Sequence, residues 1–580
     1  MSMPAKKKLP IGVSDFASII NDNACYVDKT QLIMRLIDNN AKNSAILFTR
    51  PRRFGKTLNL DMLRCFFDCN HKEENRSLFE GLSVSQSPRH MEEQGKYPII
   101  YLTFKNAKYR KWEQAQEGLC YEIYEFLAPY EYLEHSPNLT DNEKQRLRKL
   151  RSLDVNLTML RSSLTFLCRI LVKHHAQPVV LLIDEYDVPI QSAYQNGYYA
   201  EMIDFMRAFM TTGLKDNPNL RLAVITGVMR IAKDSLFSGL NNLTIDTILS
   251  EDYDDCFGFT QTDIEAMLEY YGKSEKLAEL KDWYDGYRFG NRDIYNPWSV
   301  LRYFSQNCRA DAYWLDTSSN DLTIAFLQRL EQDNREKVWE LYRGGTVTAP
   351  IDTAVSYQQL DSCNSDILFS LMAVTGYLKP TERVSGAFYR LAIPNREIQT
   401  IYVQEIASHL EHTLRIDSLQ RLSVAMVLGQ EREFQNILNE YMLASLSYYD
   451  DLESFYHCWM MGVLIGLYNE YVCLSNREAG LGRADILLIP RSGKKLPGLV
   501  FELKRAETPE DLPKASAAAL QQIAAKRYAK AFPTEVGEVR CFGIAFCGKE
   551  CHIRSVECGE LSVELNKDEV RRMKEEVWDA

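Results

Sequence analysis

The stretch RPRRFGKT, residues 50–57, decides the fold of the first part of this chain. A short apolar run that starts at Ala45 comes before it and a helical pattern of apolar residues follows it, so the sequence predicts a strand, a loop and a helix. Phosphate-binding loops have this setting, and their common form is G-x-x-x-x-G-K-[ST]. Arg50 stands where the first glycine is expected. We interpret the stretch as a variant in which a proline turn and added positive charge replace that glycine.

The chemistry of a phosphate loop needs converging backbone N–H groups, a helix N-terminus, a lysine for charge and a hydroxyl for a metal ion. Gly55, Lys56 and Thr57 supply these groups at the start of the predicted helix. Arg52 and Arg53 precede them. We expect all five residues to bind the phosphates of a nucleotide, with Thr57 also a ligand of Mg²⁺. Because Gly-Lys-Thr before a helix is a common tripeptide, the prediction depends on a second element.

That second element is the apolar strand VVLLIDEYD, residues 179–187, which ends in adjacent acids. Asp184 can hold Mg²⁺ through water, and Glu185 can orient or deprotonate the water that attacks the phosphate. Paired acids at the end of an apolar strand are costly without a cation. The two elements together predict a site for ATP and Mg²⁺, although the residues leave the choice between ATP and GTP open.

A third stretch, VITGVMR at residues 224–230, extends the predicted nucleotide site. It places Thr226 at the end of another strand, where a polar residue could sense the terminal phosphate. Arg230 follows and could reach a phosphate. A solvated loop residue is the alternative for Arg230. We expect both residues to bind the nucleotide and keep that alternative open.

Composition and patterning predict an α/β protein. The chain has 580 residues, of which 46% are hydrophobic and 25% are charged, as in folded soluble proteins. Apolar strands alternate with helical patterns up to about residue 260, which predicts the mostly parallel, doubly covered sheet of a P-loop NTPase-like domain. Helical patterns follow, and residues 366–395 predict a helix and two strands that suit a winged-helix unit. The remainder returns to α/β character.

We expect three domains: a P-loop ATPase domain over residues 1–260, a helical lid and winged-helix-like region over 261–425, and an α/β domain over 426–580. The net charge of -11 does not exclude nucleic-acid binding, because a basic groove can lie on an acidic body. The longest apolar run, residues 458–468, is too short to span a bilayer, so no membrane association is expected. Fourteen cysteines without a secretory signal indicate reduced thiols in a cytoplasmic protein.

The third domain contains a second group of chemical side chains. RADILLI (483–489) and GLVFELK (498–504) predict the two strands of a hairpin. Alternation places Glu502 and Lys504 on one face of the second strand, and folding of the hairpin brings Asp485 near Glu502. Two carboxylates can hold the Mg²⁺ that cleaves a phosphodiester, and the lysine can orient the nucleophile. We expect all three residues to be catalytic, with Asp485 and Glu502 as metal ligands; the alternative is an exposed charged hairpin.

Several motifs spread over nearly the whole chain resemble those of one family: LPIGVSDFASII, YVDKTQLI, RPRRFGKT, LLIDEYD, ITGVMR, DGYRFG with YNPWSV, and the C-terminal hairpin. The chain resembles the AAA-like ATPase proteins, abundant in gut and anaerobic bacteria, that carry a PD-(D/E)XK nuclease-like domain at the C-terminus. Members commonly carry the same loop without its first glycine. The resemblance therefore implies that residues 50–57 still form a nucleotide site and that residues 426–580 hold an intact nuclease site.

The resemblance also implies two supporting residues of the nuclease site. Nuclease cores of this kind often carry an upstream glutamate, which is Glu478 here. An amphipathic helix expected over residues 515–532 places Gln522, Lys526 and Tyr528 near one another, similar to the glutamine-and-tyrosine helix of RecB-like nucleases. We expect Glu478 and Gln522 to support the catalytic residues.

These observations lead to one main hypothesis and two rivals. We expect an ATP-binding and ATP-hydrolysing protein whose first domain controls a Mg²⁺-dependent nuclease, acting on DNA in preference to RNA and able to form a homo-oligomer. One rival is a nucleotide-gated switch or scaffold that recruits a partner through the winged-helix-like middle and uses a non-cleaving nuclease-like domain for binding. Another is a slow NTPase that only clamps nucleic acid. The sequence does not define the preferred nucleic acid or the biological role.

Overall fold

The described residues of the computed structural model form two compact units, residues 1–399 and 400–580. The division into three domains stays a prediction. The described ranges are 6–39, 44–152, 155–231, 236–237, 240–314, 337, 340–341, 344–354, 365–402, 416–445, 453–467, 470–479, 482–491, 496–533 and 535–558.

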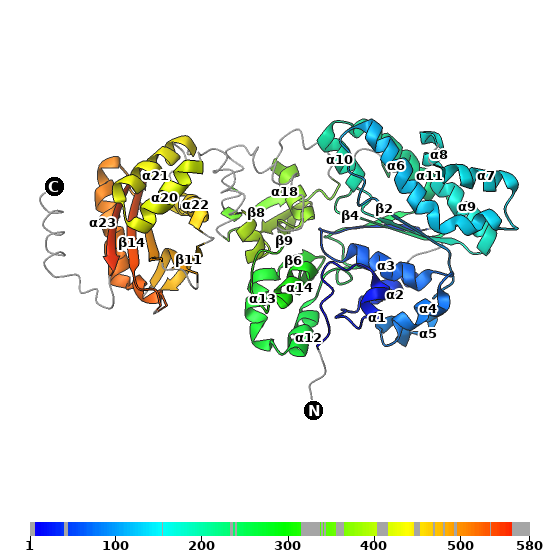
Figure 1. The fold of residues 1–580 in the computed structure, drawn as a ribbon, viewed down its shortest axis with the longest axis horizontal. Helices are drawn as coiled ribbons and strands as arrows, with labels where there is room; N and C mark the ends of the chain where they lie inside the picture. The colour runs from blue at the N-terminus through cyan, green and yellow to red at the C-terminus, as the bar shows by residue number, and fades with distance from the viewer. Residues whose placement is uncertain are drawn as a thin grey trace, which may run out of the picture. The chain divides into compact units, whose positions relative to one another are not determined.

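A five-stranded parallel sheet forms the centre of the first unit (Figure 1). Its spatial order is β2-β3-β4-β1-β5. The strands predicted from the apolar runs that start at Ala45 and that cover residues 179–187 and 224–230 are confirmed as β1, β3 and β4, and a further apolar run forms β2. The sequence patterns miss β5 because it has only four residues, two of which are polar. The strands are β1 (Ser44–Thr49), β2 (Ile99–Thr103), β3 (Val179–Asp184), β4 (Leu220–Gly227) and β5 (Leu243–Asp246).

Helices cover both faces of this sheet, with α3 and its neighbours α1, α2 and α4 on one face and α6 to α11 on the other (Figure 1). One of the helical patterns that alternate with the apolar strands covers residues 143–173, and in the structure it is divided among α7, α8 and α9. The side chain of Asn156 caps a new helix start there and accepts the N–H of Met159. The helices are α1 (Phe16–Asn21), α2 (Gln31–Asn39), α3 (Lys56–Phe67), α4 (Lys72–Arg76), α5 (Pro88–Met91), α6 (Trp112–Leu127), α7 (Asp141–Leu150), α8 (Leu157–Arg161), α9 (Ser163–His175), α10 (Val188–Asn196) and α11 (Tyr199–Leu214).

The rest of the first unit, as far as the structure describes it, contains a helical layer, the two-stranded hairpin β6–β7 and a three-stranded antiparallel sheet of order β8-β10-β9. Ile264, Tyr284 and Tyr303 belong to one hydrophobic cluster of the helical layer. The helix and two strands predicted within residues 366–395 are confirmed, and an unpredicted strand, β8, pairs with the second of them. The elements are α12 (Gln261–Tyr271), α13 (Leu277–Tyr284), β6 (Tyr287–Phe289), β7 (Arg292–Ile294), α14 (Pro297–Ser305), β8 (Val347–Pro350), α18 (Ser365–Thr375), β9 (Lys379–Ser385) and β10 (Phe388–Ala392).

A mixed five-stranded sheet of order β11-β12-β13-β14-β15 forms the centre of the second unit. The pair β13 and β14 is parallel, and the other pairs are antiparallel. The hairpin predicted from RADILLI and GLVFELK is confirmed as β12 and β13, and the two sheets together confirm the α/β fold class. The strands are β11 (Tyr471–Ala479), β12 (Gly482–Pro490), β13 (Gly498–Arg505), β14 (Val539–Cys547) and β15 (Glu550–Cys558).

Helices pack on both faces of the second sheet. On one face, Phe434 of α21 packs against Phe542, with ring centroids 5.5 Å apart, and Phe542 stacks on Phe501. On the opposite face α23 lies so close that a Cβ on Gly543 would be 2.4 Å from the carbonyl oxygen of Ser516. The helices are α20 (Ile416–Leu428), α21 (Glu431–Ser445), α22 (Glu453–Val463) and α23 (Leu512–Lys526).

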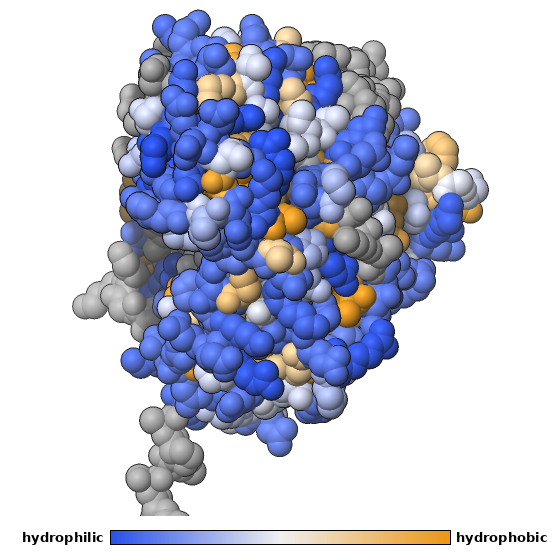
Figure 2. Space-filling model, turned by 90° about the vertical axis from the view of Figure 1, so that its right-hand side faces the viewer, coloured by the Kyte–Doolittle hydropathy of each residue, from blue (hydrophilic) through white to orange (hydrophobic). Residues whose placement is uncertain are grey.

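Within the described residues, every helix is too short or too polar to cross a membrane. The described part of the longest apolar run, residues 458–467, falls in α22 and the short helix after it (Leu464–Leu467), where Trp459 and Leu464 are buried. The face of the molecule in Figure 2 is mostly hydrophilic, and hydrophobic residues are scattered over it.

Candidate functional sites

The backbone of the loop between β1 and α3 takes two left-handed conformations. Gly55 precedes α3 with φ +82°, where a residue with a Cβ would be strained even though no atom lies within 4 Å of that position. Arg53 has φ +69°, which is uncommon for a residue other than glycine. No side chain caps the N-terminus of α3. Its first N–H groups are therefore available to an anion.

Arg50, at the position of the missing glycine, is a buried structural residue with 0% of its surface exposed. Its guanidinium pairs with the carboxylate of Asp246 at the end of β5 and donates to the carbonyl of Thr49 at 3.0 Å. The same group lies over the rings of Phe257 and Phe289, 5.2 and 5.0 Å from their centroids. The side chain thus ties the loop to β5.

Lys56 lies across the inside of this loop. Its ammonium donates to the carbonyls of Arg50 and Pro51 at 2.9 and 2.8 Å, and the residue is 7% exposed. Burial lowers the pKa of Lys56 to about 8, although the carboxylates of Glu185 and Asp187 work in the opposite direction. The lysine therefore sits where a phosphate group would replace the two carbonyls as its partner.

The structure brings together Thr57, Asp184 and Thr226, which are far apart in the sequence. The Thr57 hydroxyl donates to Oδ2 of Asp184 at 2.8 Å, and the Thr226 hydroxyl donates to Oδ1 at 2.5 Å. Asp184 is completely buried. A hydroxyl at a helix start beside a strand-end carboxylate is a donor set that suits Mg²⁺ and a phosphate.

Two further acids follow Asp184. Glu185 has φ +52° and is half-buried, and burial, together with the neighbouring Asp184 charge, raises its pKa. Asp187, which the sequence analysis did not assign, is 3% exposed and accepts the N–H groups of Val228 and Met229 at 2.8 and 3.1 Å. Its other oxygen is buried without a hydrogen-bond partner in the described part of the chain. The last acid of the DEYD run is the signal that could have identified it.

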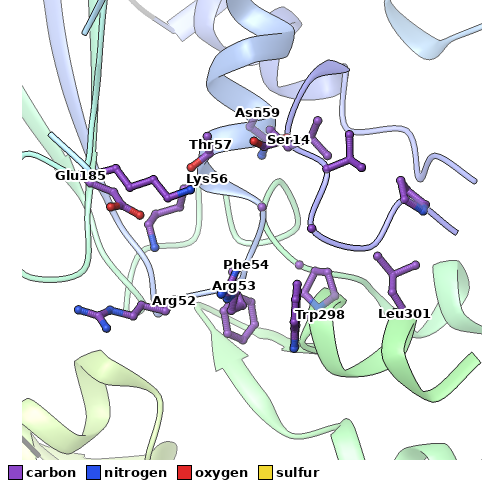
Figure 3. Close-up of a pocket in the computed structure, with 18 of the residues that line it drawn as sticks. Ser14, Arg52, Arg53, Phe54, Lys56, Thr57, Asn59, Glu185, Trp298 and Leu301 are labelled. Carbon is purple, nitrogen blue, oxygen red and sulfur yellow. The ribbon is translucent and has the colours of Figure 1, made fainter. Parts of the chain in front are cut away.

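A cavity of about 610 Å³ lies over the loop and has two chemically different ends (Figure 3). Trp298 and Leu301 of α14 stand on one side, Glu185 stands on the other, and Lys56 and Thr57 lie between them. We call the side of Trp298 and Leu301 the apolar end, and the side of Glu185 and Arg52 the polar end. Other apolar residues that line the cavity include Pro10, Val13, Ile19, Val27, Phe259 and Pro297. Other polar residues that line it include Lys105, Asn106, Lys108, Asp187 and Gln191.

Four further residues predicted to bind the nucleotide, Arg52, Arg53, Thr226 and Arg230, differ in their position relative to the cavity. Arg52 and Arg53 line the cavity, whereas neither Thr226 nor Arg230 is among the described lining residues. Arg52 donates to the side chain of Gln191 at 3.3 Å. The Arg53 guanidinium lies 4.3 Å from the ring centroid of Trp298. Trp298, which the sequence analysis did not assign, thus forms a wall between Arg53 and the apolar end.

A second group of functional side chains lies where β12 and β13 separate. The ladder between these strands ends at the pair of Ile486 and Phe501, and the Asp485 carboxylate instead accepts the N–H of Leu503 at 2.8 Å. Glu502 is 1% exposed, and its Oε1 lies 3.4 Å from the ammonium of Lys504. The three predicted residues are therefore neighbours.

Glu502 has the properties of a cation ligand. Its Oε2 is buried and has no hydrogen-bond partner among the described residues. Burial, followed by the Asp485 charge, raises the pKa of Glu502 to about 7, while Lys504 opposes the shift. An orphaned carboxylate oxygen next to a second carboxylate fits a hard cation such as Mg²⁺. No group of three potential metal ligands from His, Cys, Asp or Glu occurs in the part of the chain that the structure describes.

Of the two residues predicted to support the nuclease site, the structure describes the side chain of Gln522 but not that of Glu478. The Gln522 amide donates to Oε1 of Glu502 from α23. Glu478 lies in β11 opposite Arg483, but its side chain is outside the described part of the chain. His457 of α22 faces the backbone carbonyl of Asp485 at 3.1 Å.

The helix expected to run through Tyr528 ends at Lys526, so that prediction is wrong. Arg527 takes the left-handed φ of +55° and stops α23, and Tyr528 begins a separate short helix. The break turns the Tyr528 hydroxyl toward the carbonyl of Arg483, to which it donates at 2.6 Å, while the Gln522 amide still lies 3.5 Å from it. The proximity of Gln522 and Tyr528 thus arises from a turn and not from helical spacing.

Comparison with known proteins gives matches for both units. A sequence model described as a predicted AAA-ATPase matches residues 10–237, and a model of the PD-(D/E)XK nuclease superfamily matches residues 451–556. An uncharacterized protein of the vnfD 5′ region of Azotobacter chroococcum mcd 1 is 30% identical over 406 residues, which are 68% of this chain and 69% of that protein.

Proposed function

Since the chain belongs to the family of AAA-ATPase-like proteins with a PD-(D/E)XK nuclease-superfamily domain, we propose that it binds and hydrolyses ATP and thereby controls a Mg²⁺-dependent nuclease. DNA is the proposed substrate in preference to RNA, and the cytoplasm is the proposed location. The observation that carries the first half is the contact of Thr57 with Asp184 beside a cavity of about 610 Å³. The observation that carries the second half is the partnerless oxygen of Glu502 beside Asp485 and Lys504.

In the nucleotide site, the phosphates replace the loop carbonyls as partners of Lys56, and the N-terminus of α3 supplies backbone donors. Thr57 and Asp184 would hold Mg²⁺, which neutralises charge on the phosphates. Glu185 would accept a proton from the attacking water, and its raised pKa and its position in the lining of the cavity support this role. The base and ribose lie at the apolar end, against Trp298.

In the nuclease site, Asp485 and Glu502 would hold Mg²⁺, which polarises the scissile phosphate and activates water. Lys504, whose ammonium is 3.4 Å from Glu502, orients the nucleophile and stabilises the charge that develops on the phosphate. Gln522 fixes the rotamer of Glu502 through its hydrogen bond to Oε1. Metal binding requires Glu502 to lose its proton, so we expect Mg²⁺ affinity to rise with pH up to about 7.

A second candidate function is a nucleotide-gated switch with a non-cleaving nuclease-like domain. One observation favours it: Phe54 of the phosphate loop packs against Tyr287 and Phe289 of the β6–β7 hairpin, with ring centroids 4.9 and 5.1 Å away. A ligand that moves the loop would therefore also move the helical layer. In this case Asp485→Ala would remove a metal without removing an activity.

The test is a cleavage assay on single- and double-stranded DNA and RNA, with Mg²⁺ or Mn²⁺ and with or without ATP. Wild-type protein is compared with Glu502→Ala and Lys56→Ala. We expect cleavage to be lost in Glu502→Ala and its dependence on ATP to be lost in Lys56→Ala. Turnover of ATP without cleavage under any condition would reject the nuclease and favour the switch.

A further inference from the structure

The loop after β2, residues 104–109, brings positive charge to the polar end of the cavity. Thr103 pairs with Asp184 in the sheet, and the N–H of Phe104 donates to the Asp184 carbonyl at 3.0 Å. The loop therefore leaves the sheet directly beside Asp184 and Glu185. Lys105, Asn106 and Lys108 of this loop line the cavity.

The loop is held in a defined conformation at both ends. The N–H of Ala107 donates to Phe104 at 3.0 Å, and Ala107 is completely buried. At the far end, the Ser192 hydroxyl of α10 accepts the N–H of Tyr109 at 3.1 Å, and the Tyr198 hydroxyl donates to the Tyr109 carbonyl at 2.6 Å. These anchors fix the backbone from which the two lysines project.

Lys105 and Lys108 have no partner for their charge. Both are exposed, and neither ammonium makes a hydrogen bond or ion pair with any residue that the structure describes. Lys29, which lines the same cavity, is by contrast tied to Asp263 at 2.9 Å. Two unpaired cations on an anchored loop beside a phosphate site indicate a role in binding an anion.

The order of groups along the cavity indicates which anion they meet. The apolar end at Trp298 takes the base, and Lys56 and Thr57 lie in the middle, where the loop binds phosphates (Figure 3). The part of a nucleotide that extends farther, toward Glu185, is its terminal phosphate. The carboxylates of Glu185 and Asp187 would repel that phosphate if no cation stood near them.

We propose that Lys105 and Lys108 bind the terminal phosphate of a nucleoside triphosphate, so that the site distinguishes triphosphate from diphosphate with cations of its own chain. This inference rests on the proposed ATP site and adds to it the two side chains that distinguish ATP from ADP. A diphosphate ends before the two lysines and does not engage them. The two lysines therefore strengthen the binding of ATP but not the binding of ADP.

The test is isothermal titration of ADP and of a non-hydrolysable ATP analogue, each with Mg²⁺, into the full-length protein. In Lys105→Ala/Lys108→Ala, we expect the affinity for the ATP analogue to fall about tenfold or more, as the loss of charge-assisted hydrogen bonds predicts, and the affinity for ADP to stay within about twofold. Lys105→Arg/Lys108→Arg should retain the preference. Lys111→Ala is the matched control, because Lys111 is exposed at the start of α6 but does not line the cavity.

Equal losses of affinity for the two nucleotides, or no loss for either, would overturn the inference while leaving the ATP site itself in place. Thermal unfolding of each variant separates a folding defect from a loss of binding. If neither nucleotide binds wild-type protein, the proposed function fails and this inference fails with it. Lys56→Ala should weaken both nucleotides, which distinguishes the loop lysine from the other two.

Discussion

At the scale of single residues, Arg50 explains how a phosphate loop can exist without its first glycine. The guanidinium is fully buried and held by Asp246, so the residue is part of the protein core and does not face the ligand. The sequence alone predicts added positive charge at this position but not its direction. That direction is set by the aspartate of β5 and two aromatic rings that lie about 200 residues away in the chain.

We predict that Arg50→Gly, which restores the common form of the motif, destabilises the protein. The change leaves the buried Asp246 carboxylate without its partner, and removal of one member of a buried pair costs about 3–5 kcal/mol. Urea unfolding of the first unit measures this loss. Arg50→Gly/Asp246→Asn should recover part of the stability, and a single variant as stable as wild type would show that the pair is not a structural requirement.

Lys56 gives a prediction about pH. Its pKa is lowered to about 8 in the ligand-free site, mainly by burial, and bound phosphates would hold it protonated. Above about pH 8 the lysine must therefore take up a proton when a nucleotide binds, and the affinity should fall by up to about tenfold per pH unit. Titration calorimetry from pH 7 to 9.5, in buffers of different ionisation enthalpy, measures both effects. Lys56→Arg should remove this transition, and a constant wild-type affinity would contradict the assignment.

Glu397 gives a prediction about stability. It is completely buried, its Oε1 accepts the N–H of Trp314 at 3.0 Å, and its Oε2 has no partner among the described residues. Burial raises its pKa from 4.5 to about 8. Between these values the folded chain binds one more proton than the unfolded chain, so the free energy of unfolding decreases as pH rises.

In numbers, wild-type protein should lose about 1–3 kcal/mol of stability between pH 5.5 and 8 relative to Glu397→Gln. Urea unfolding at both values measures the difference. Glu251→Gln is the control, because this carboxyl is exposed. If the wild-type and Glu397→Gln profiles stay parallel, the buried carboxyl does not hold an extra proton.

At the scale of elements, the outer edge of strand β15 makes hydrogen bonds to side chains of helix α21 and not to another strand. Glu431, Gln435 and Asn439 lie four residues apart on one face of α21. Their side-chain oxygens accept the N–H groups of Ser555, Ile553 and Cys551, at 2.5, 3.1 and 2.7 Å. The exposed donors of an edge strand promote association between chains, so this contact protects the edge.

We predict that Asn439→Leu weakens the second unit and promotes its self-association. The N–H of Cys551 would remain buried without an acceptor, which costs about 1–3 kcal/mol. Urea unfolding and size-exclusion chromatography measure the two effects. Asn439→Asp keeps an acceptor at the same place and should preserve both the stability and the monomeric fraction of the wild type.

The elements also show where sequence reasoning succeeds. Long apolar runs, such as residues 179–184, predict strands because burial on both faces requires continuous hydrophobicity. The end of α23 could not be predicted, since Arg527 stops the helix in a conformation for which glycine is the usual signal. Alternation along β13 predicts that Glu502 and Lys504 share one face, which needs only local geometry, and their charged groups lie 3.4 Å apart in the structure. The Mg²⁺ site itself also needs Asp485 from β12 and stays a prediction.

At the scale of the whole molecule, the phosphate loop is in contact with parts of the first unit that are not among the described residues lining the cavity. Phe54 packs on the β6–β7 hairpin, and Pro51 lies against Gly376, which follows α18. The sequence predicts the phosphate loop and the helix within residues 366–395, but it does not predict the β6–β7 hairpin. It also contains no signal for the contacts among these segments, because the residues are more than 200 positions apart. This contact is the physical basis on which ATP could act beyond its own site.

We therefore predict that Gly376→Ala changes nucleotide binding although Gly376 does not line the cavity. A Cβ at this position would lie 3.0 Å from the Cβ of Pro51, and the φ of +93° adds backbone strain. Movement of the phosphate loop would relieve the contact with Pro51 but not the backbone strain. We therefore expect the contact to lower the affinity for ATP by about five- to tenfold, which is about 1–1.4 kcal/mol. The dependence of cleavage on ATP should weaken in the same variant.

Gly386→Ala is the matched control for this prediction. Gly386 also has a left-handed φ, +56°, but nothing lies within 4 Å of its Cβ position in the β9–β10 turn. Alanine at this position should therefore suffer left-handed backbone strain without any pressure on the loop, and its ATP affinity should stay within about twofold of wild type. Titration of ATP and the cleavage assay, applied to both variants, separate the two cases. Equal behaviour of Gly376→Ala and Gly386→Ala would mean that strain alone acts and that the contact with Pro51 does not transmit the state of the nucleotide site.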